Sequence, residues 1–384
     1  MAGLYIHIPF CKSRCAYCGF YSTTMLALRD EYVDAVCREM ALRRGYLDGL
    51  QRGQSGVRPI ISTVYVGGGT PSQLSEDGLR RLFHNIYKVY SIADDAEITV
   101  ECNPDDVTPS LAVALRDVGV NRVSLGAQTF DDGILRFIRR RHTSRQTQMA
   151  VATLRNAGFS NISIDLMFGL PGQTRALWSG DISRALALGV EHISAYSLMY
   201  EDDTPLMSML RKGEIRETDD EMCLSMYDEL IDRLADAGFE HYEISNFARP
   251  GKRSRHNSSY WDGTPYIGLG AAAHSFDIAS RQWNVSDASA YIDGIRHGVV
   301  SMERETLDIP TRYNEMVMTR LRTCGGIDVN AVAATFGVEY RDFLIDSAAI
   351  HIHNGNLAAH GGILRLSRKG LFVSNMVMSD LMRV

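Results

Sequence analysis

Three cysteines lie close together near the start of the chain, in the stretch YIHIPFCKSRCAYCGF. Cys11, Cys15 and Cys18 have the spacing C-x3-C-x2-C. Clustered thiolates suit soft metals, chiefly zinc or iron–sulfur clusters. Zinc sites usually combine two C-x2-C pairs, or two cysteines with two histidines, and no partner pair follows here. Iron–sulfur clusters normally take four cysteines. Three cysteines therefore predict a [4Fe–4S] cluster with one iron open to a small molecule that carries an amine and a carboxylate.

The alternative, three buried apolar thiols, is weak because loops are usually exposed. The remaining cysteines are scattered, and each is interpreted as a small apolar core residue. These are Cys37, Cys102, Cys223 and Cys324. Composition is ordinary, with 45% hydrophobic and 22% charged residues and a net charge of −6, which argues against a dedicated nucleic-acid binder. No apolar run approaches the roughly 20 residues of a membrane span. We expect a cytoplasmic protein with no nucleic-acid partner and at most peripheral membrane association.

Apolar runs alternate with amphipathic stretches over residues 4–244. Strands are predicted at residues 4–8, 63–66, 97–101, 122–125, 163–167 and 192–198, with a further strand at 241–244. Helices are predicted at residues 30–44, 76–90, 109–118, 146–157, 177–188 and 219–237. Such alternation indicates an α/β fold with a parallel sheet. Six units that curl round give a partial (β/α)6 TIM-like barrel, and a doubly wound open sheet is the competing architecture.

The alternation weakens after about residue 245. Residues 249–273 are rich in Gly, Pro, Ser and aromatic residues, and we expect a loop there. From residue 311, two helical stretches and a hairpin-like segment predict a small helical, winged-helix-like domain. The chain is thus divided into a barrel (1–245), a connecting segment (246–310) and a C-terminal domain (311–384).

Unusual polar or flexible residues follow the predicted strands at their C-terminal ends, where barrel enzymes place their chemistry. They are Gly68, Gly69, Thr70, Glu101, Gln128, Asp165 and Met199. A simple tight turn is the alternative for the glycines, and a surface carboxylate is the alternative for Glu101. Asp165 lies in an otherwise apolar strand, where a lone charge is costly to bury. Arg140 is the nearest candidate for a cationic partner.

The cysteine spacing and its place after the first strand resemble the radical S-adenosylmethionine (SAM) superfamily. In that superfamily SAM binds the open iron and is cleaved to a 5′-deoxyadenosyl radical. Longer stretches, among them YVGGGTPS, DLMFGLPGQT and HNSSYWDGTPYIGLGAAAHSF, resemble the oxygen-independent coproporphyrinogen III oxidase family over nearly the whole chain. The true oxidases have an extra cysteine at the position of Phe20 and an extension ahead of the barrel. Both departures resemble a branch of heme chaperones instead.

The resemblance implies a protein that takes heme from a donor and delivers it to respiratory hemoproteins, with a homodimer as one possible state. The rival function is an oxidase that decarboxylates two propionates of coproporphyrinogen III, so whether the protein is an enzyme stays open. The resemblance also implies that Cys11, Cys15 and Cys18 hold the cluster and that Tyr17 contacts adenine. Residues that would contact the cluster-bound SAM are Tyr5, Gly68 and Glu101. Residues that match contacts to a second SAM in the oxidases are Gly69, Thr70, Gln128, Arg140, Asp165 and Met199.

The mark of the heme-chaperone branch is an H-N-x-x-Y-W motif, which begins here at His256 and includes Tyr260 and Trp261. A neutral imidazole is a common axial ligand of heme iron. Aromatic side chains can cover a porphyrin face. The alternative is that His256 caps a loop and that the two aromatic residues simply pack beneath it.

Overall fold

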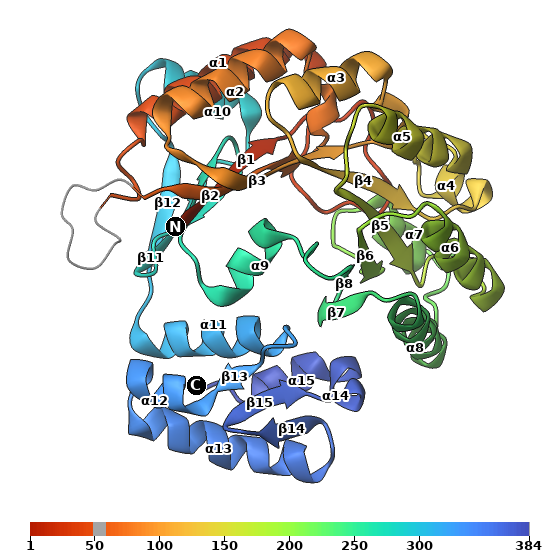
Figure 1. The fold of residues 1–384 in the computed structure, drawn as a ribbon, viewed down its shortest axis with the longest axis vertical. Coiled ribbons are helices and arrows are strands. Elements are labelled where there is room, and N and C mark those ends of the chain that lie inside the picture. Colours follow the sequence, from red (N-terminus) through yellow and green to blue (C-terminus); the bar gives the residue numbers. More distant parts are fainter. Residues whose placement is uncertain (49–58, 384) are drawn as a thin grey trace.

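The computed structural model describes residues 1–48 and 59–383, and its largest element is a curved sheet (Figure 1). Six parallel strands pair in chain order at its centre. They are β1 (Ala2–Ile8), β2 (Ile61–Gly68), β3 (Ile92–Cys102), β4 (Arg122–Gln128), β5 (Ile162–Phe168) and β6 (His192–Ser197). A doubly wound sheet would reverse its strand order at a switch point, and this one does not. The expected partial TIM-like barrel is therefore confirmed.

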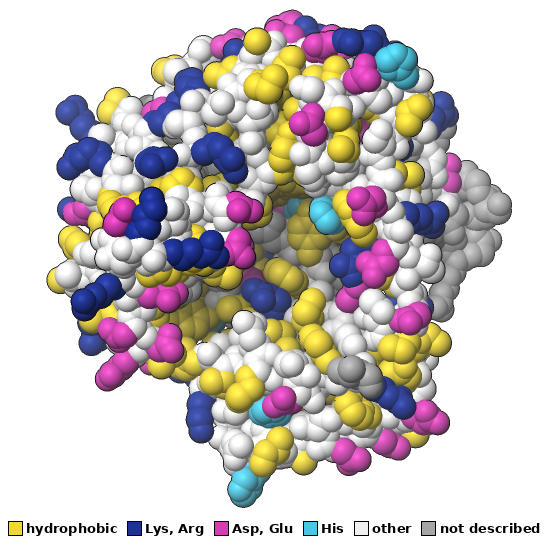
Figure 2. All heavy atoms as spheres, turned by 180° about the vertical axis from the view of Figure 1, so that it is seen from behind, with side chains coloured by type: hydrophobic (Ala, Val, Ile, Leu, Met, Phe, Trp, Pro, Cys, Tyr) yellow, Lys and Arg dark blue, Asp and Glu magenta, His cyan; other side chains and the backbone are white. Residues whose placement is uncertain are grey.

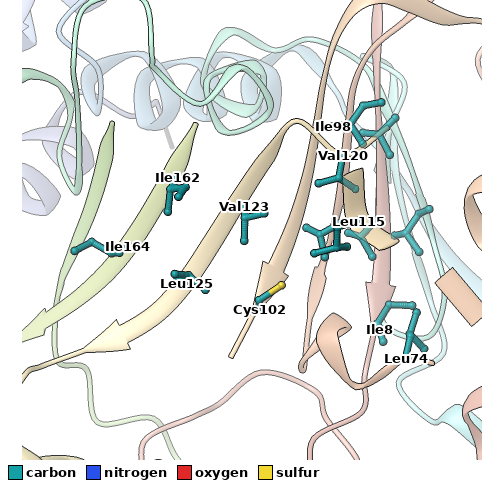
Figure 3. Close-up of a cluster of buried hydrophobic side chains, with 14 of the residues drawn as sticks. Ile8, Leu74, Ile98, Cys102, Leu115, Val120, Val123, Leu125, Ile162 and Ile164 are labelled. Carbon is teal, nitrogen blue, oxygen red and sulfur yellow. The ribbon is translucent and has the colours of Figure 1, made fainter. Parts of the chain in front are cut away.

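Helices cover the outer face of the arc (Figure 1). They are α1 (Arg29–Leu42), α2 (Glu76–Val89), α3 (Pro109–Asp117), α4 (Asp132–Phe137), α5 (Ser144–Asn156), α6 (Arg175–Ala187) and α8 (Asp220–Asp236). Helix α7 (Pro205–Arg211) instead lies beside the cysteine loop, where the Leu206 N–H donates to the Ala16 carbonyl (2.9 Å). Ser75, Thr108 and Thr174 each cap a helix by accepting a hydrogen bond from a backbone N–H in its first turn. Figure 3 shows part of the apolar layer between strands and helices, in which Val123, Leu125 and their neighbours are buried.

The other face of the strands points into the barrel and is polar. Side chains alternate between the two faces of a strand, so residues next to the apolar layer face inward. The inward set includes Tyr5, His7, Tyr65, Glu101, Arg122, Ser124, Asp165 and Ser194. A TIM barrel normally fills this space with branched apolar side chains. The polar interior is thus the unusual feature that the site is built on.

The sheet continues beyond the six strands at both edges. Beside β1 lie β9 (Tyr266–Leu269), β10 (His274–Phe276), β11 (Ser280–Asn284) and β12 (Met302–Thr306), and beside β6 lie β8 (Asn246–Ala248) and β7 (Glu240–Glu243). The expected loop at residues 249–273 is wrong over α9 (Arg255–Asp262) and β9. Its glycines have a packing reason, because a Cβ on Gly268 would lie 1.9 Å from the carbonyl oxygen of His274. Helix α10 (Ala288–Arg296) follows β11 and packs against α1.

The C-terminal region has its own cluster of buried apolar side chains, drawn from Tyr313 to Leu381. Its elements are α11 (Ile309–Leu321), β13 (Ile327–Asp328), α12 (Val329–Phe336), α13 (Val338–His353), β14 (Leu357–His360), β15 (Ile363–Leu366), α14 (Arg368–Phe372) and α15 (Ser374–Asp380). The expected helices and hairpin are present, and the domain boundaries remain a prediction. Over residues 1–48 and 59–383, no helix has the length and apolar character needed to cross a bilayer.

A buried ion pair ties α1 to the added strands. Arg43 lies 3.1 Å from Glu39, and both side chains are buried. The Arg43 guanidinium donates to the Gly268 carbonyl (2.8 Å) and to Ser275 Oγ (2.9 Å). Glu39 accepts from the Gly270 N–H (2.8 Å). This network holds β9 and β10 against α1 at a fixed position.

We expect Arg43→Met to lower the free energy of unfolding by about 3–5 kcal/mol, because it leaves the Glu39 carboxylate buried without its cation. Urea denaturation followed by circular dichroism measures the change. The control is Arg80→Met, which breaks the exposed Arg80–Asp117 pair and should cost about 0–1 kcal/mol. Equal losses in the two variants would show that the Glu39–Arg43 pair has no special role.

Candidate functional site

The cysteine loop follows β1 and lies beside the end of β2, where Ile8 pairs with Gly68. All three thiol residues are partly buried. Cys11 Sγ lies 3.3 Å from Thr70 Oγ1, and Cys15 Sγ lies 3.4 Å from Arg140 Nη1. Burial raises the pKa of the Cys11 and Cys18 thiols, with a further contribution from the Cys15 thiol.

Among the described residues, no three His, Cys, Asp or Glu side chains are gathered closely enough to hold a metal ion. Cys11 and Cys15 instead contact Thr70 and Arg140. The donor set still fits a three-thiolate [4Fe–4S] cluster, because three partly exposed thiols share one short loop. The thiolate form also has a cation nearby in Arg140.

The glycine turn packs against the protein's own first strand. Gly68 has a φ of +109°, and a Cβ there would lie 2.7 Å from the His7 ring. A Cβ on Gly69 would lie 2.6 Å from the Pro9 carbonyl carbon. These contacts correspond to the tight-turn interpretation. They also bring the backbone of the turn close to Glu101, since the Gly68 N–H donates to Glu101 Oε2 (3.1 Å).

Glu101 lies inside the barrel and not on the outer surface. Tyr65 OH donates to its Oε1 at 2.6 Å. Burial raises the pKa of Glu101 to about 7, against the lowering effects of the Tyr65 hydrogen bond and the Arg122 charge. A carboxylate in this position can accept further hydrogen bonds from hydroxyl groups of a ligand.

Asp165 also faces the interior, where Ser124 Oγ donates to its Oδ1 at 3.4 Å. Burial raises its pKa, and the charges of Arg122 and Arg140 act in the opposite direction. Arg140, the expected partner of Asp165, directs its hydrogen bonds to Cys15, to the Gly126 carbonyl (2.6 Å) and to Asn103. No direct contact between Arg140 and Asp165 is recorded in the described part of the chain.

Arg122 is a site residue that the sequence reasoning missed. Its side chain is 1% exposed, and its Nε and Nη1 have no hydrogen-bond partner among the described residues. Its positive charge lowers the pKa of both Glu101 and Asp165. The signal was the one used for Asp165, because Arg122 is also a charged residue in an apolar predicted strand.

The remaining expected contacts divide between the barrel interior and its rim. Tyr5 faces inward, with its hydroxyl 3.1 Å from His7 Nδ1 and its ring stacked on Tyr65 at 6.2 Å. Gln128 is buried and has a φ of +65°, a conformation uncommon outside glycine and typical of functional positions. Tyr17 packs with the apolar cluster around Ile138, whereas Met199 is 68% exposed at the rim.

His256 lies at the opposite end of the barrel from the cysteines. Helix α9 lies inside the arc of strands (Figure 1), and its first N–H groups donate to the Glu97 carboxylate at 2.9 and 3.0 Å. The His256 ring is buried, with Nδ1 2.9 Å from Thr63 Oγ1 and Nε2 2.8 Å from Tyr260 OH. Burial lowers its pKa to about 3.

Both nitrogens of His256 are thus occupied, and the geometry corresponds to the packing alternative. Trp261 points toward α11, with Arg322 5.1 Å from its ring centroid. The roles of His256, Tyr260 and Trp261 toward heme stay predictions. Helix α9 closes one end of the barrel, whereas the face seen from behind in Figure 2 is hollowed at its centre among hydrophobic and basic side chains.

Two protein families match parts of this chain. Residues 5–179 match the radical SAM superfamily and residues 307–373 match the HemN C-terminal domain. The heme chaperone HemW of Bacillus subtilis is 37% identical over 341 residues, which are 88% of this chain and 87% of that protein. HemW of Mycobacterium tuberculosis is 33% identical over 386 residues, 99% of this chain and 94% of that protein. The chain therefore belongs to the radical SAM superfamily and, within it, to the family of the HemW proteins.

The fold has a match among solved structures. Coproporphyrinogen III oxidase (HemN) from Escherichia coli, a radical SAM enzyme, superimposes with a TM-score of 0.84 at 22% identity. The match covers 99% of this chain and 89% of that one. At this identity the likeness concerns the fold alone. Membership of the superfamily implies a [4Fe–4S] cluster and SAM.

We expect each of Cys11→Ala, Cys15→Ala and Cys18→Ala to abolish the cluster, because the remaining two thiolates cannot hold it. Iron and sulfide content after anaerobic reconstitution, together with visible absorbance, measures the loss. Cys223→Ala is the matched control and should keep a full cluster, since Cys223 lies outside the loop. Retention of iron in any of the three loop variants would contradict the assignment.

Stability should depend on pH through Glu101, whose pKa is raised from 4.5 to about 7 in the folded ligand-free chain. Between these values the folded state binds the proton more tightly than the unfolded state, so stability falls as pH rises. Relative to Glu101→Gln, the wild type should lose about 1–3 kcal/mol of unfolding free energy across this window and change little above it. Denaturant titrations at several pH values measure it. Glu339→Gln is the control, and its stability should follow pH in parallel with the wild type. Parallel curves for the wild type and Glu101→Gln would contradict the prediction.

Proposed function

We propose that the protein is a cytoplasmic heme chaperone that binds heme, a [4Fe–4S] cluster and SAM, and delivers heme to respiratory hemoproteins. The observation that carries the proposal is the similarity to proteins named heme chaperone HemW over as much as 99% of the chain. Position 20 adds support. Phe20 stands where the resemblance to the oxidases would require a fourth cysteine, and its side chain is 74% exposed at the edge of the cysteine loop.

In this proposal Cys11, Cys15 and Cys18 would hold the cluster, which when bound would supply an open iron for SAM and one-electron chemistry. Glu101 accepts hydrogen bonds from ribose hydroxyls, because its carboxylate is already aligned by Tyr65 and the Gly68 N–H. Glu101 must be ionised for this role. A ligand that donates to the carboxylate favours the charged form and so lowers its pKa.

Arg140 would offer its positive charge to an anionic group of the ligand, because its Nη1 lies beside Cys15 at 3.4 Å. Its other hydrogen bonds, to Asn103 and to the Gly126 carbonyl, keep the guanidinium at the rim of the barrel. Arg122, Asp165 and Ser124 form the polar wall deeper inside. The proposal leaves open whether a second SAM binds and whether the protein is a homodimer. It also leaves open which proteins donate and accept the heme.

The deciding experiment is anaerobic incubation of reconstituted protein with coproporphyrinogen III, SAM and a reductant. We expect no protoporphyrinogen IX, since the protein handles finished heme. In parallel, hemin titration should give a shifted Soret band, and heme should pass to a heme-free respiratory cytochrome. Free hemin at the same concentration is the control for the transfer step. Formation of protoporphyrinogen IX would sink the chaperone proposal in favour of the oxidase.

A further inference from the structure

The histidines of the chain differ in whether their rings are engaged. Of the 11 histidines, most have a hydrogen bond from a ring nitrogen to another group. Those engaged are His7, His142, His192, His241, His256, His297 and His351. Those with no ring hydrogen bond among the described residues are His84, His274, His353 and His360. A ligand for heme iron needs a ring nitrogen that is free and accessible.

Only one of these four lies on the inner side of the barrel sheet in the described part of the chain. His84 is on the outer helix α2, and His353 and His360 belong to the C-terminal region. His274 begins β10. Its neighbour Ser275 hydrogen-bonds Arg43 on the side of α1. Because side chains alternate along a strand, His274 points to the opposite, concave face.

The surroundings of His274 form an aromatic wall. Trp283 pairs with it across β10 and β11, and the two rings stack at 5.9 Å with an interplanar angle of 25°. Phe276 lies on the same face and pairs with Tyr266 of β9. The centroid of the Tyr266 ring lies 6.4 Å from that of the Phe276 ring and 4.8 Å from that of the Tyr260 ring. Aromatic surface of this kind is suited to covering a flat macrocycle.

His274 is exposed yet lies near the barrel interior. Strand β10 is separated from β1 in the sheet only by β9, and His7 of β1 faces the barrel interior. His7 in turn lies against Gly68 of the glycine turn. Partial burial and the nearby Arg281 lower the pKa of His274 itself, so its imidazole is neutral at neutral pH. A neutral imidazole offers the lone pair that iron needs.

We propose that His274 is the axial ligand of the bound heme iron and that the heme lies along the aromatic wall of Trp283 and Phe276, beside the SAM site. This inference rests on the proposed heme-chaperone function. It replaces His256, whose two ring nitrogens are hydrogen-bonded and buried. The His274 ring has no hydrogen bond among the described residues, whereas a bond from His256 to iron would require its contact with Thr63 or Tyr260 to break.

The test uses the full-length reconstituted chain and hemin. The variant is His274→Gly, which removes the ligand and leaves a space for free imidazole. Hemin should bind about tenfold or more weakly, with loss of the Soret position that marks histidine ligation. Added imidazole should restore the wild-type spectrum. A merely structural role for the side chain would give no such rescue.

Two variants serve as controls. His353→Gly removes an exposed histidine of α13 and should leave the affinity and spectrum unchanged. His256→Gln should lower the unfolding temperature while keeping the wild-type Soret position. A wild-type protein that binds no hemin would overturn the proposed function itself. Wild-type binding with an unchanged His274→Gly spectrum would overturn only the assignment of His274. Two results together would assign the role of iron ligand to His256 instead. These are loss of the histidine Soret signature in His256→Gln and failure of imidazole to restore it in His274→Gly.

Discussion

The burial of three charges inside one barrel is the constraint on which the rest of the site depends. Glu101, Asp165 and Arg122 lie within the polar interior, where an isolated charge would cost several kcal/mol. The charge of Arg122 opposes the effect of burial on both carboxyl groups. Tyr65 and Ser124 supply additional hydrogen bonds. Because the space is lined by polar groups and not filled with branched apolar side chains, it suits a ligand rich in hydroxyl and charged groups.

The two ends of the incomplete barrel differ in the elements that they hold. Six parallel strands leave an open side, which the added strands at the β1 edge extend and which α9 enters (Figure 1). Helix α9 is anchored by Glu97, and its His256 bonds to Thr63 on β2. That end is therefore closed by α9, which is hydrogen-bonded to β2 and β3. The other end holds the cysteine loop and the glycine turn, where the proposed ligands would bind.

Much of this arrangement could be predicted from sequence, and the failures have physical reasons. The six central strands were found because each is an apolar run with a helix of period 3.6 on either side. The loop prediction for residues 249–273 rested on their richness in Gly, Pro, Ser and aromatic residues, whereas Gly268 and Gly270 are small because the backbone carbonyls of His274 and His7 approach them closely. The cysteine cluster needed only spacing. The sequence could not show that His256 lies far from the cysteines, because this distance depends on which end of β2 contacts α9.

The positions of His7 and His274 bear on how two ligands would influence each other. His7 of β1 contacts the glycine turn, and His274 begins β10, which only β9 separates from β1, so the two proposed binding regions lie on neighbouring strands of one sheet. Ligands in such neighbouring positions affect each other's affinity by the same factor in both directions. If SAM orders the turn against His7, it also fixes the surroundings of His274 and favours heme. If instead the two ligands compete for this space, binding of one favours release of the other, which would let the proposed chaperone give up its heme.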